Sequence, residues 1–106
     1  MLVFHLKKEW FDLIKQGKKT HEFRVVNEYW ETRISNYLNS FFSEEDFEEG
    51  VKVFYEDIPI KFVLGYTKKF LNAKLISINK INGKNTDLKI DREVFDLEFK
   101  LMEENK

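Results

Sequence analysis

The segment GKKTHEFR, residues 17–24, concentrates the side chains of this chain that are best suited to chemistry. Residues 20–26 are rich in β-branched and aromatic types, which predicts a strand. Because side chains alternate along a strand, Glu22 and Arg24 share one face, and Lys19 stands where the strand begins. A carboxylate and a guanidinium at this spacing can line a pocket together, as acceptor and forked donor. The alternative is an ordinary surface ion pair, worth at most about 1 kcal/mol.

Helices are predicted on both sides of this strand. Residues 2–6, LVFHL, form an apolar run typical of a first strand, and residues 8–16 follow a helical pattern that Gly17 ends. Asn27 suits the N-cap of a second helix. The apolar residues of that helix recur at helical spacing: Trp30, Ile34, Tyr37, Leu38 and Phe41. Ser43 and Asp46 have capping-box spacing for one more short turn.

After Gly50 the hydrophobic pattern changes to alternation, which predicts about four further strands. The expected strands are 51–56, 60–64, 73–81 and 93–101. We expect a turn at 57–59, a basic loop at 66–72 and a polar connection at 84–92. The order strand, helix, strand, helix and then strands predicts a single α+β domain over residues 1–106, built on a small, strongly bent sheet or barrel.

Composition excludes several classes of function. The chain has 106 residues and no cysteine, so a disulfide scaffold, a cysteine-based zinc site and thiol catalysis are excluded. With only His5 and His21 as histidines, we expect no metal and no cofactor. His5 lies in an apolar run and is expected to be structural, and His21 is expected to point away from Glu22. No apolar run approaches the roughly 18 residues of a membrane span, and lysines follow the N-terminal apolar run, so we expect a cytoplasmic protein.

The formal net charge of −1 conceals segregated charge. Residues 7–24 carry six basic and three acidic side chains, and residues 61–92 carry eight basic and two acidic ones. Residues 43–57 and 93–106 are acidic. A mixed, solvated surface is one interpretation. The other is that the two basic segments lie side by side and form one electropositive cleft for a nucleotide or polyanion.

A family resemblance emerges from the order of four segments. LKKEWFDLIKQGKKTHEFR, residues 6–24, resembles the signature of the ASCH domain within the PUA-like superfamily, through Gly17, Lys19, Thr20, Glu22 and Arg24. NEYWETRI at 27–34, VLGYTKKF at 63–70 and EVFDLEFKL at 93–101 are similar to later segments of its small stand-alone members, many of them encoded by phages. The resemblance implies a PUA-like β-barrel of about five to six strands with two helices beside it. It also implies a cleft that binds RNA or a nucleotide-like ligand.

Some ASCH proteins are amidohydrolases that deacylate N4-acetylcytidine, using a lysine in the turn, a threonine three residues later and a glutamate from a later loop. This sequence keeps the lysine as Lys19 but has Glu22 at the threonine position. Thr20 is displaced from it, and residues 76–92 contain no glutamate. The hydroxyl nucleophile of that mechanism is therefore missing. Binding without catalysis is the favoured reading, with Lys19 and Glu22 as the only catalytic candidates.

The expected ligand site combines the turn with other polar and aromatic side chains. Its predicted members are Lys19, Glu22, Arg24, Arg33, Tyr66, Lys68 and Lys69. Tyr66 would stack on a base while lysines meet phosphate. Trp30 lies three residues from Arg33 on one helix, and both could join the cleft wall. Trp10 and Trp30 nevertheless belong to apolar stripes and are assigned mainly to the core. A third class of function is a protein-interaction module, in which the acidic segment 43–57 and exposed Phe41, Phe42 and Phe47 contact a protein partner.

Overall fold

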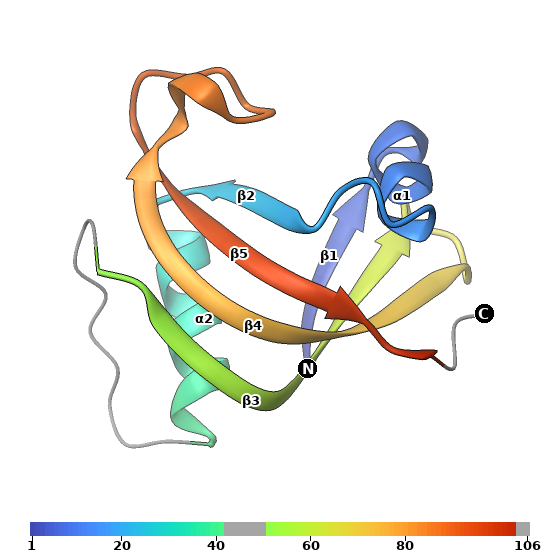
Figure 1. Cartoon of the computed structure of the whole chain (residues 1–106). Helices are drawn as coiled ribbons and strands as arrows, with labels where there is room; N and C mark the ends of the chain where they lie inside the picture. The colour runs from blue at the N-terminus through green and yellow to red at the C-terminus, as the bar shows by residue number, and fades with distance from the viewer. Residues whose placement is uncertain (42–50, 104–106) are drawn as a thin grey trace.

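The computed structural model describes residues 1–41 and 51–103. Their elements follow one another in this order: β1 (Leu2–Leu6), α1 (Lys8–Lys15), β2 (His21–Val25), α2 (Glu28–Asn39), β3 (Val53–Leu64), β4 (Phe70–Asn82), the 3-10 turn η1 (Gly83–Asn85) and β5 (Glu93–Leu101). Figure 1 shows the strands as one curled sheet with α1 and α2 beside it. The predicted Ser43–Asp46 turn lies outside the described residues.

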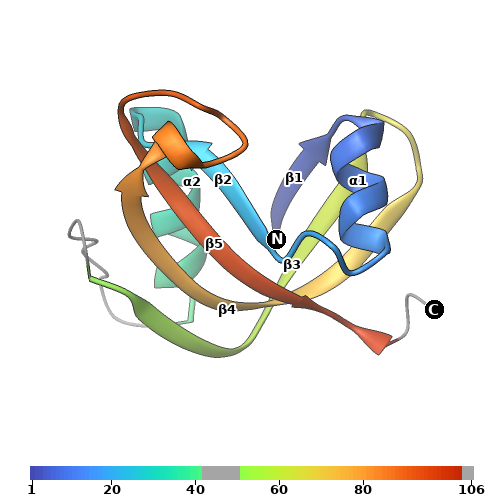
Figure 2. The same ribbon diagram turned by 45° about the horizontal axis from the view of Figure 1, so that its top comes forward.

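The five strands form a single half-barrel in the order β1-β3-β4-β5-β2. β1 runs parallel to β3, and the other neighbouring pairs are antiparallel. This confirms the predicted small α+β barrel with two helices. β1 and β2 are the two edges of the sheet, and Figure 2 shows them facing each other across its open side.

β3 and β4 are longer than the sequence predicts, whereas β5 has the predicted bounds. The expected turn at 57–59 is wrong, because β3 continues through it and only shifts its register against β4 between Phe54 and Ile58. Asp57 has φ 56°, so the chain is bulged there rather than reversed. The expected loop at 66–72 is also too long, because β4 already begins at Phe70.

Phenylalanine rings fill the interior of the half-barrel. Phe62 lies with its ring centroid 5.7 Å from that of Phe4 and 4.5 Å from that of Phe99. All three are buried, and they join residues from every strand but β2 in one core cluster. Tightly packed rings bury much area with few residues, which suits a domain of this size.

Two local signals in the sequence set the boundaries around β2. Gly17 has φ 77°, a conformation that favours glycine, and it ends α1 as predicted. The Asn27 side chain accepts a hydrogen bond from the Trp30 backbone N–H and caps α2. β2 is therefore held short between two helices. Within the described ranges, no helix has the length and apolarity needed to cross a membrane.

Candidate functional site

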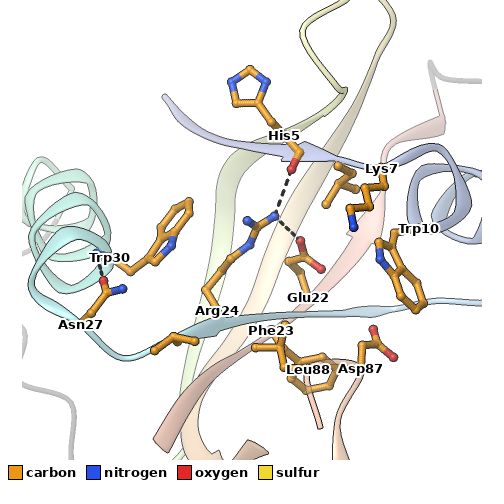
Figure 3. Close-up of a pocket in the computed structure, with 12 residues that line it drawn as sticks. His5, Lys7, Trp10, Glu22, Phe23, Arg24, Asn27, Trp30, Asp87 and Leu88 are labelled. Atoms are coloured by element: carbon orange, nitrogen blue, oxygen red, sulfur yellow. Dashed lines mark hydrogen bonds and ion pairs between the residues drawn. The ribbon is translucent and has the colours of Figure 1, made fainter. Parts of the chain in front are cut away.

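A pocket of about 420 Å³ opens between the sheet edges β1 and β2. Its walls come from β1, the first turn of α1, β2, the start of α2 and the connection after η1. Figure 3 shows Trp30 of α2 on one side, Trp10 of α1 on the other, and Arg24 projecting between them. The pocket therefore lies at the open side of the half-barrel, between strands that do not pair with each other.

Glu22 is the most deeply placed charged group that lines this pocket. Its residue is 5% exposed, and it lies opposite the buried Leu97 in the β2–β5 register. Glu22 Oε2 accepts a hydrogen bond of 2.5 Å from Nη2 of Arg24. The two residues therefore share the inner face of β2, as their spacing predicts, and they form a largely buried ion pair instead of a surface one.

The guanidinium of Arg24 spans the gap between the two sheet edges. Its Nη2 lies 3.4 Å from the backbone oxygen of His5 on β1. Its Cζ lies 5.0 Å from the ring centroid of Trp30 and 5.2 Å from that of Phe4. The buried Nε has no hydrogen-bond partner in the described part of the chain. Arg24 is thus held by stacking and by a carboxylate, with donor capacity to spare.

Lys19 connects the carboxylate of Glu22 to Asp87, which lies in the loop after η1. Its ammonium lies 3.6 Å from Glu22 Oε1 and forms an ion pair with Asp87. It also lies 5.5 Å and 5.1 Å from the ring centroids of Trp10 and Phe23. Lys19, Glu22 and Arg24 therefore lie together, but Lys19 itself does not line this pocket. Asp87 was missed, because it lies in a connection that the sequence identifies only as polar and basic.

The loop that carries Asp87 is closed tightly at Gly83. The Gly83 N–H donates to the Arg92 oxygen at 2.8 Å, and the Gly83 oxygen accepts from the Ile90 N–H at 3.2 Å. A Cβ at Gly83 would lie 2.8 Å from the Ile90 oxygen and 2.9 Å from Val94 Cγ1. This close approach leaves no room for a side chain. It keeps the loop over the pocket, where Asp87 and Leu88 form part of the wall.

Trp10 and Trp30 serve both the core and the pocket. Both are partly buried and pack against the core cluster, as predicted, and both also line the pocket. Trp30 stacks on Phe4 with ring centroids 5.3 Å apart. They are the only two tryptophans in the chain. A place in the cleft wall was the alternative considered for Trp30. For Trp10 only the core was expected, because an apolar stripe on a helix does not show which of its side chains will border a pocket.

The remaining predicted site residues do not line the pocket. Tyr66 is 92% exposed and stacks on His5 at a centroid distance of 4.6 Å, so it stands next to a lining residue. Arg33 lies over the ring of Tyr29 at 5.4 Å, on the exposed side of α2. Lys68 and Lys69 lie in the turn between β3 and β4, also outside the lining residues.

The two basic segments, 7–24 and 61–92, do not combine to form one electropositive cleft at this pocket. The segment 61–92 contributes only Asp87 and Leu88 to its walls, an acid and an apolar residue. Lysines of that segment pair elsewhere: Lys74 with Asp57, Lys80 with Glu31, and Lys84 with Asp91. The lining cations, Lys7 and Arg24, come from the first basic segment alone. The pocket is therefore mixed in charge.

The two histidines differ from each other in their placement. His21 lies on the outer face of β2, as predicted, with Nδ1 2.6 Å from Asp96 Oδ1. His5 lies in β1, as predicted, but it is exposed and lines the pocket. The reason is alternation, because Phe4 and Leu6 take the inward positions on either side of it. Its Nδ1 lies 2.7 Å from the Gly65 oxygen.

This arrangement suits the binding of a flat, polar molecule. Two indole rings flank it, a buried carboxylate can accept hydrogen bonds, and a guanidinium can donate them. Among residues 1–41 and 51–103, no group of three or more histidine or acidic side chains is arranged to hold a metal ion. Phe41 is exposed, as the protein-interaction hypothesis expects, but Phe42 and Phe47 lie outside the described residues.

Residues 4–38 match the ASCH domain, one of the PUA-like domain families. The match covers α1 and β2 completely, together with most of β1 and α2. It therefore includes the lining residues His5, Trp10, Glu22, Arg24 and Trp30. This confirms the resemblance predicted from the sequence. No protein of curated function matches the chain significantly.

Proposed function

We propose that this protein binds RNA or a nucleotide by taking one unpaired base into the pocket between β1 and β2. The observation that carries the proposal is the Glu22–Arg24 pair, buried between Trp10 and Trp30 at the open side of the half-barrel. A base has a π-face for the indoles and a polar edge for the charged pair. The match to a PUA-like family agrees with RNA binding.

Size and hydrogen-bonding capacity support a base as the ligand. The pocket volume of about 420 Å³ falls within the roughly 300–1,000 Å³ typical of small-molecule sites. Glu22 can accept from an amino group such as that of cytosine, and Arg24 can donate to a ring carbonyl. Lys7 lines the pocket, is exposed, and is available to a phosphate.

The two tryptophans provide a direct test. Both line the pocket, so their intrinsic fluorescence reports its occupancy without a label. We expect short single-stranded oligonucleotides of C, U, A or G to quench the emission, with C quenching most strongly. Binding should weaken as salt is raised, with a slope in log K of about −0.7 for each phosphate neutralised. No quenching at low salt by any of the four, with the fold confirmed by circular dichroism, would overturn the proposal.

Matched arginine substitutions separate the pocket from the general surface charge. Arg24→Lys keeps the charge but loses the forked donor and the stacking, so affinity should fall at least about tenfold. Arg92→Lys makes the same chemical change at an exposed position that does not line the pocket, and affinity should stay within about twofold. Equal losses in both variants would point to nonspecific attraction.

One observation favours a second candidate, an amidohydrolase acting on an acylated nucleoside. Asp87 reaches Lys19 from the later loop, at a place where the sequence offers no glutamate. A lysine between two carboxylates can help a water molecule to attack an acyl carbon, with the C–N bond breaking to give acetate and the free amine. Incubation with N4-acetylcytidine, followed by chromatography, tests it. Formation of cytidine that Lys19→Ala abolishes supports the enzyme, and unchanged substrate rejects it.

A further inference from the structure

A second hollow of about 320 Å³ adjoins the first pocket on the far side of Trp10. Trp10, Phe23 and Asp87 line both. The shared residues make the two hollows neighbours, with one indole as their common wall. A ligand that extends beyond a single base can therefore contact the walls of both hollows.

The second hollow has different chemistry from the first. Its remaining lining residues include Lys18, Lys19, Thr20 and His21, which are consecutive at the entrance to β2. Lys18 and Thr20 are exposed. In the described ranges, the Lys18 ammonium has no ion-pair partner within 4.0 Å. The Lys18 ammonium and the Thr20 hydroxyl are therefore available to a ligand in the hollow.

The acids around this hollow already have partners. Asp87 pairs with Lys19, which is itself buried. His21 lies 2.6 Å from Asp96 Oδ1, and its Nε2 lies 3.9 Å from Glu98 Oε2. Asp96 and Glu98 do not line the hollow, and Lys19 is paired with Asp87. Among the described residues that line it, Lys18 is therefore the charged side chain without an ion-pair partner. The hollow therefore favours an anion, because its lining has two basic side chains, Lys18 and Lys19, and one acid, Asp87. In the first pocket two basic side chains, Lys7 and Arg24, are matched by two acids, Glu22 and Asp87.

We propose that the second hollow is a phosphate subsite, which holds a phosphate attached to the nucleoside whose base occupies the first pocket. The inference rests on the proposed function. The Lys18 ammonium and the Thr20 hydroxyl donate to the phosphate oxygens, beside the Lys19–Asp87 ion pair. Trp10 separates the base from the phosphate and contacts both ends of the ligand.

The test compares cytidine with its 3′ and 5′ monophosphates by tryptophan fluorescence at low salt. One of the monophosphates should bind about tenfold more tightly than cytidine, and this gain should shrink as salt is raised. The dinucleotide CpC carries the phosphate as a diester. A similar gain with CpC identifies an RNA strand as the source of the phosphate, and a gain with the monophosphates alone identifies a free mononucleotide.

Two lysine variants assign the gain to the hollow. Lys18→Gln should remove most of the tenfold gain while cytidine still quenches the fluorescence. Lys15→Gln removes the same charge from the last turn of α1, at an exposed position that lines neither hollow, and should keep the gain. An equal loss in both variants would show that the attraction is long-range rather than local.

The outcomes separate this inference from the proposed function. If cytidine binds but no phosphate adds affinity, or if the gain survives Lys18→Gln, the subsite is rejected and the base pocket stands. If neither the nucleoside nor any phosphorylated form binds to the folded protein, the base pocket and the subsite fall together.

Discussion

The two faces of β2 carry contacts of similar length between ionisable side chains, with different degrees of exposure. On the inner face, Glu22 and Arg24 pair at 2.5 Å inside the pocket, with side chains that are 7% and 22% exposed. On the outer face, His21 Nδ1 lies 2.6 Å from Asp96 Oδ1, with side chains that are 34% and 14% exposed. The distances are alike, so geometry does not distinguish them. Desolvation does, because removing charges from water is expensive, and a protein retains such a pair in its interior at a cost in stability.

This contrast suggests different purposes for the two faces. A pair near solvent contributes about 0–1 kcal/mol and can change with little consequence. The Glu22–Arg24 pair is largely buried, and at such a position two apolar side chains of similar volume often give the folded state equal stability. Its placement between two tryptophans, with spare hydrogen-bonding capacity on Arg24, fits the ligand recognition proposed above.

The largest expected effect comes from breaking the inner pair. Glu22→Gln leaves Arg24 and Lys19 facing a neutral amide, and the free energy of unfolding should fall by about 3 kcal/mol. Urea denaturation followed by circular dichroism measures it. A loss below about 1 kcal/mol would mean that the pair behaves as a surface pair.

A double substitution at the same place separates stability from binding. Glu22→Met combined with Arg24→Leu removes both buried charges, so most of the lost stability should return. Base-dependent quenching of the tryptophans should nevertheless be absent. If the double variant still binds oligonucleotides with normal affinity, the inner pair does not recognise the ligand.

A smaller loss of stability is expected from breaking the ion pair between Lys19 and Asp87, which joins the segment before β2 to the loop after η1. Asp87→Asn removes the charged partner that holds Lys19, and unfolding should become easier by about 1.5–2 kcal/mol. Because Asp87 belongs to the loop after η1, amide hydrogen exchange should increase within residues 83–92 before it increases in β5. Unchanged exchange in that loop would show that Gly83 alone holds it.

On the outer face, Asp96→Asn should cost less than about 1 kcal/mol. The His21 ring is 34% exposed at its side chain, so water replaces the lost partner readily. The variant should also retain full nucleoside affinity, since Asp96 does not line the first pocket. A cost comparable to that of Glu22→Gln would remove the distinction between the faces.

The smallest effect concerns alkaline pH and lies away from β2. Burial raises the pKa of the Tyr37 phenol above its ordinary value of 10.0, and its hydroxyl donates to the Pro59 oxygen at 2.5 Å. The folded protein then keeps this proton to a higher pH than the unfolded chain does. The resulting stability is present below pH about 10 and is lost as the pH rises through the raised pKa. Tyr37→Phe should flatten this decline in urea titrations, and an unchanged decline would assign it to other groups.

Local signals made much of the fold predictable. Gly17 and Asn27 mark the ends of the helices around β2, and the alternation over residues 93–101 identifies β5 and its buried face. The path of β3 was not predictable in the same way. Pro59 and its neighbours resemble a turn, but a bulge with Asp57 at positive φ lets a strand continue past a proline.

The candidate site divides along similar lines. Glu22 and Arg24 lie two residues apart, so strand alternation alone places them together. Asp87 is 68 positions from Lys19, and only the closure of the sheet brings them into contact. The sequence pattern assigned Tyr66 and the two lysines after it to the site. They do not line the pocket, because they lie in an exposed turn.

The glycine at the base of the loop has a consequence for how such a pocket evolves. Gly83 touches no part of the pocket, yet a single methyl group there would compete for space with the Ile90 oxygen and Val94. The loop would have to swing, and Asp87 and Leu88 would move with it. The aperture of the pocket is therefore set by a position outside it. A lineage can widen its range of ligands through that one hinge while every recognition residue keeps its identity.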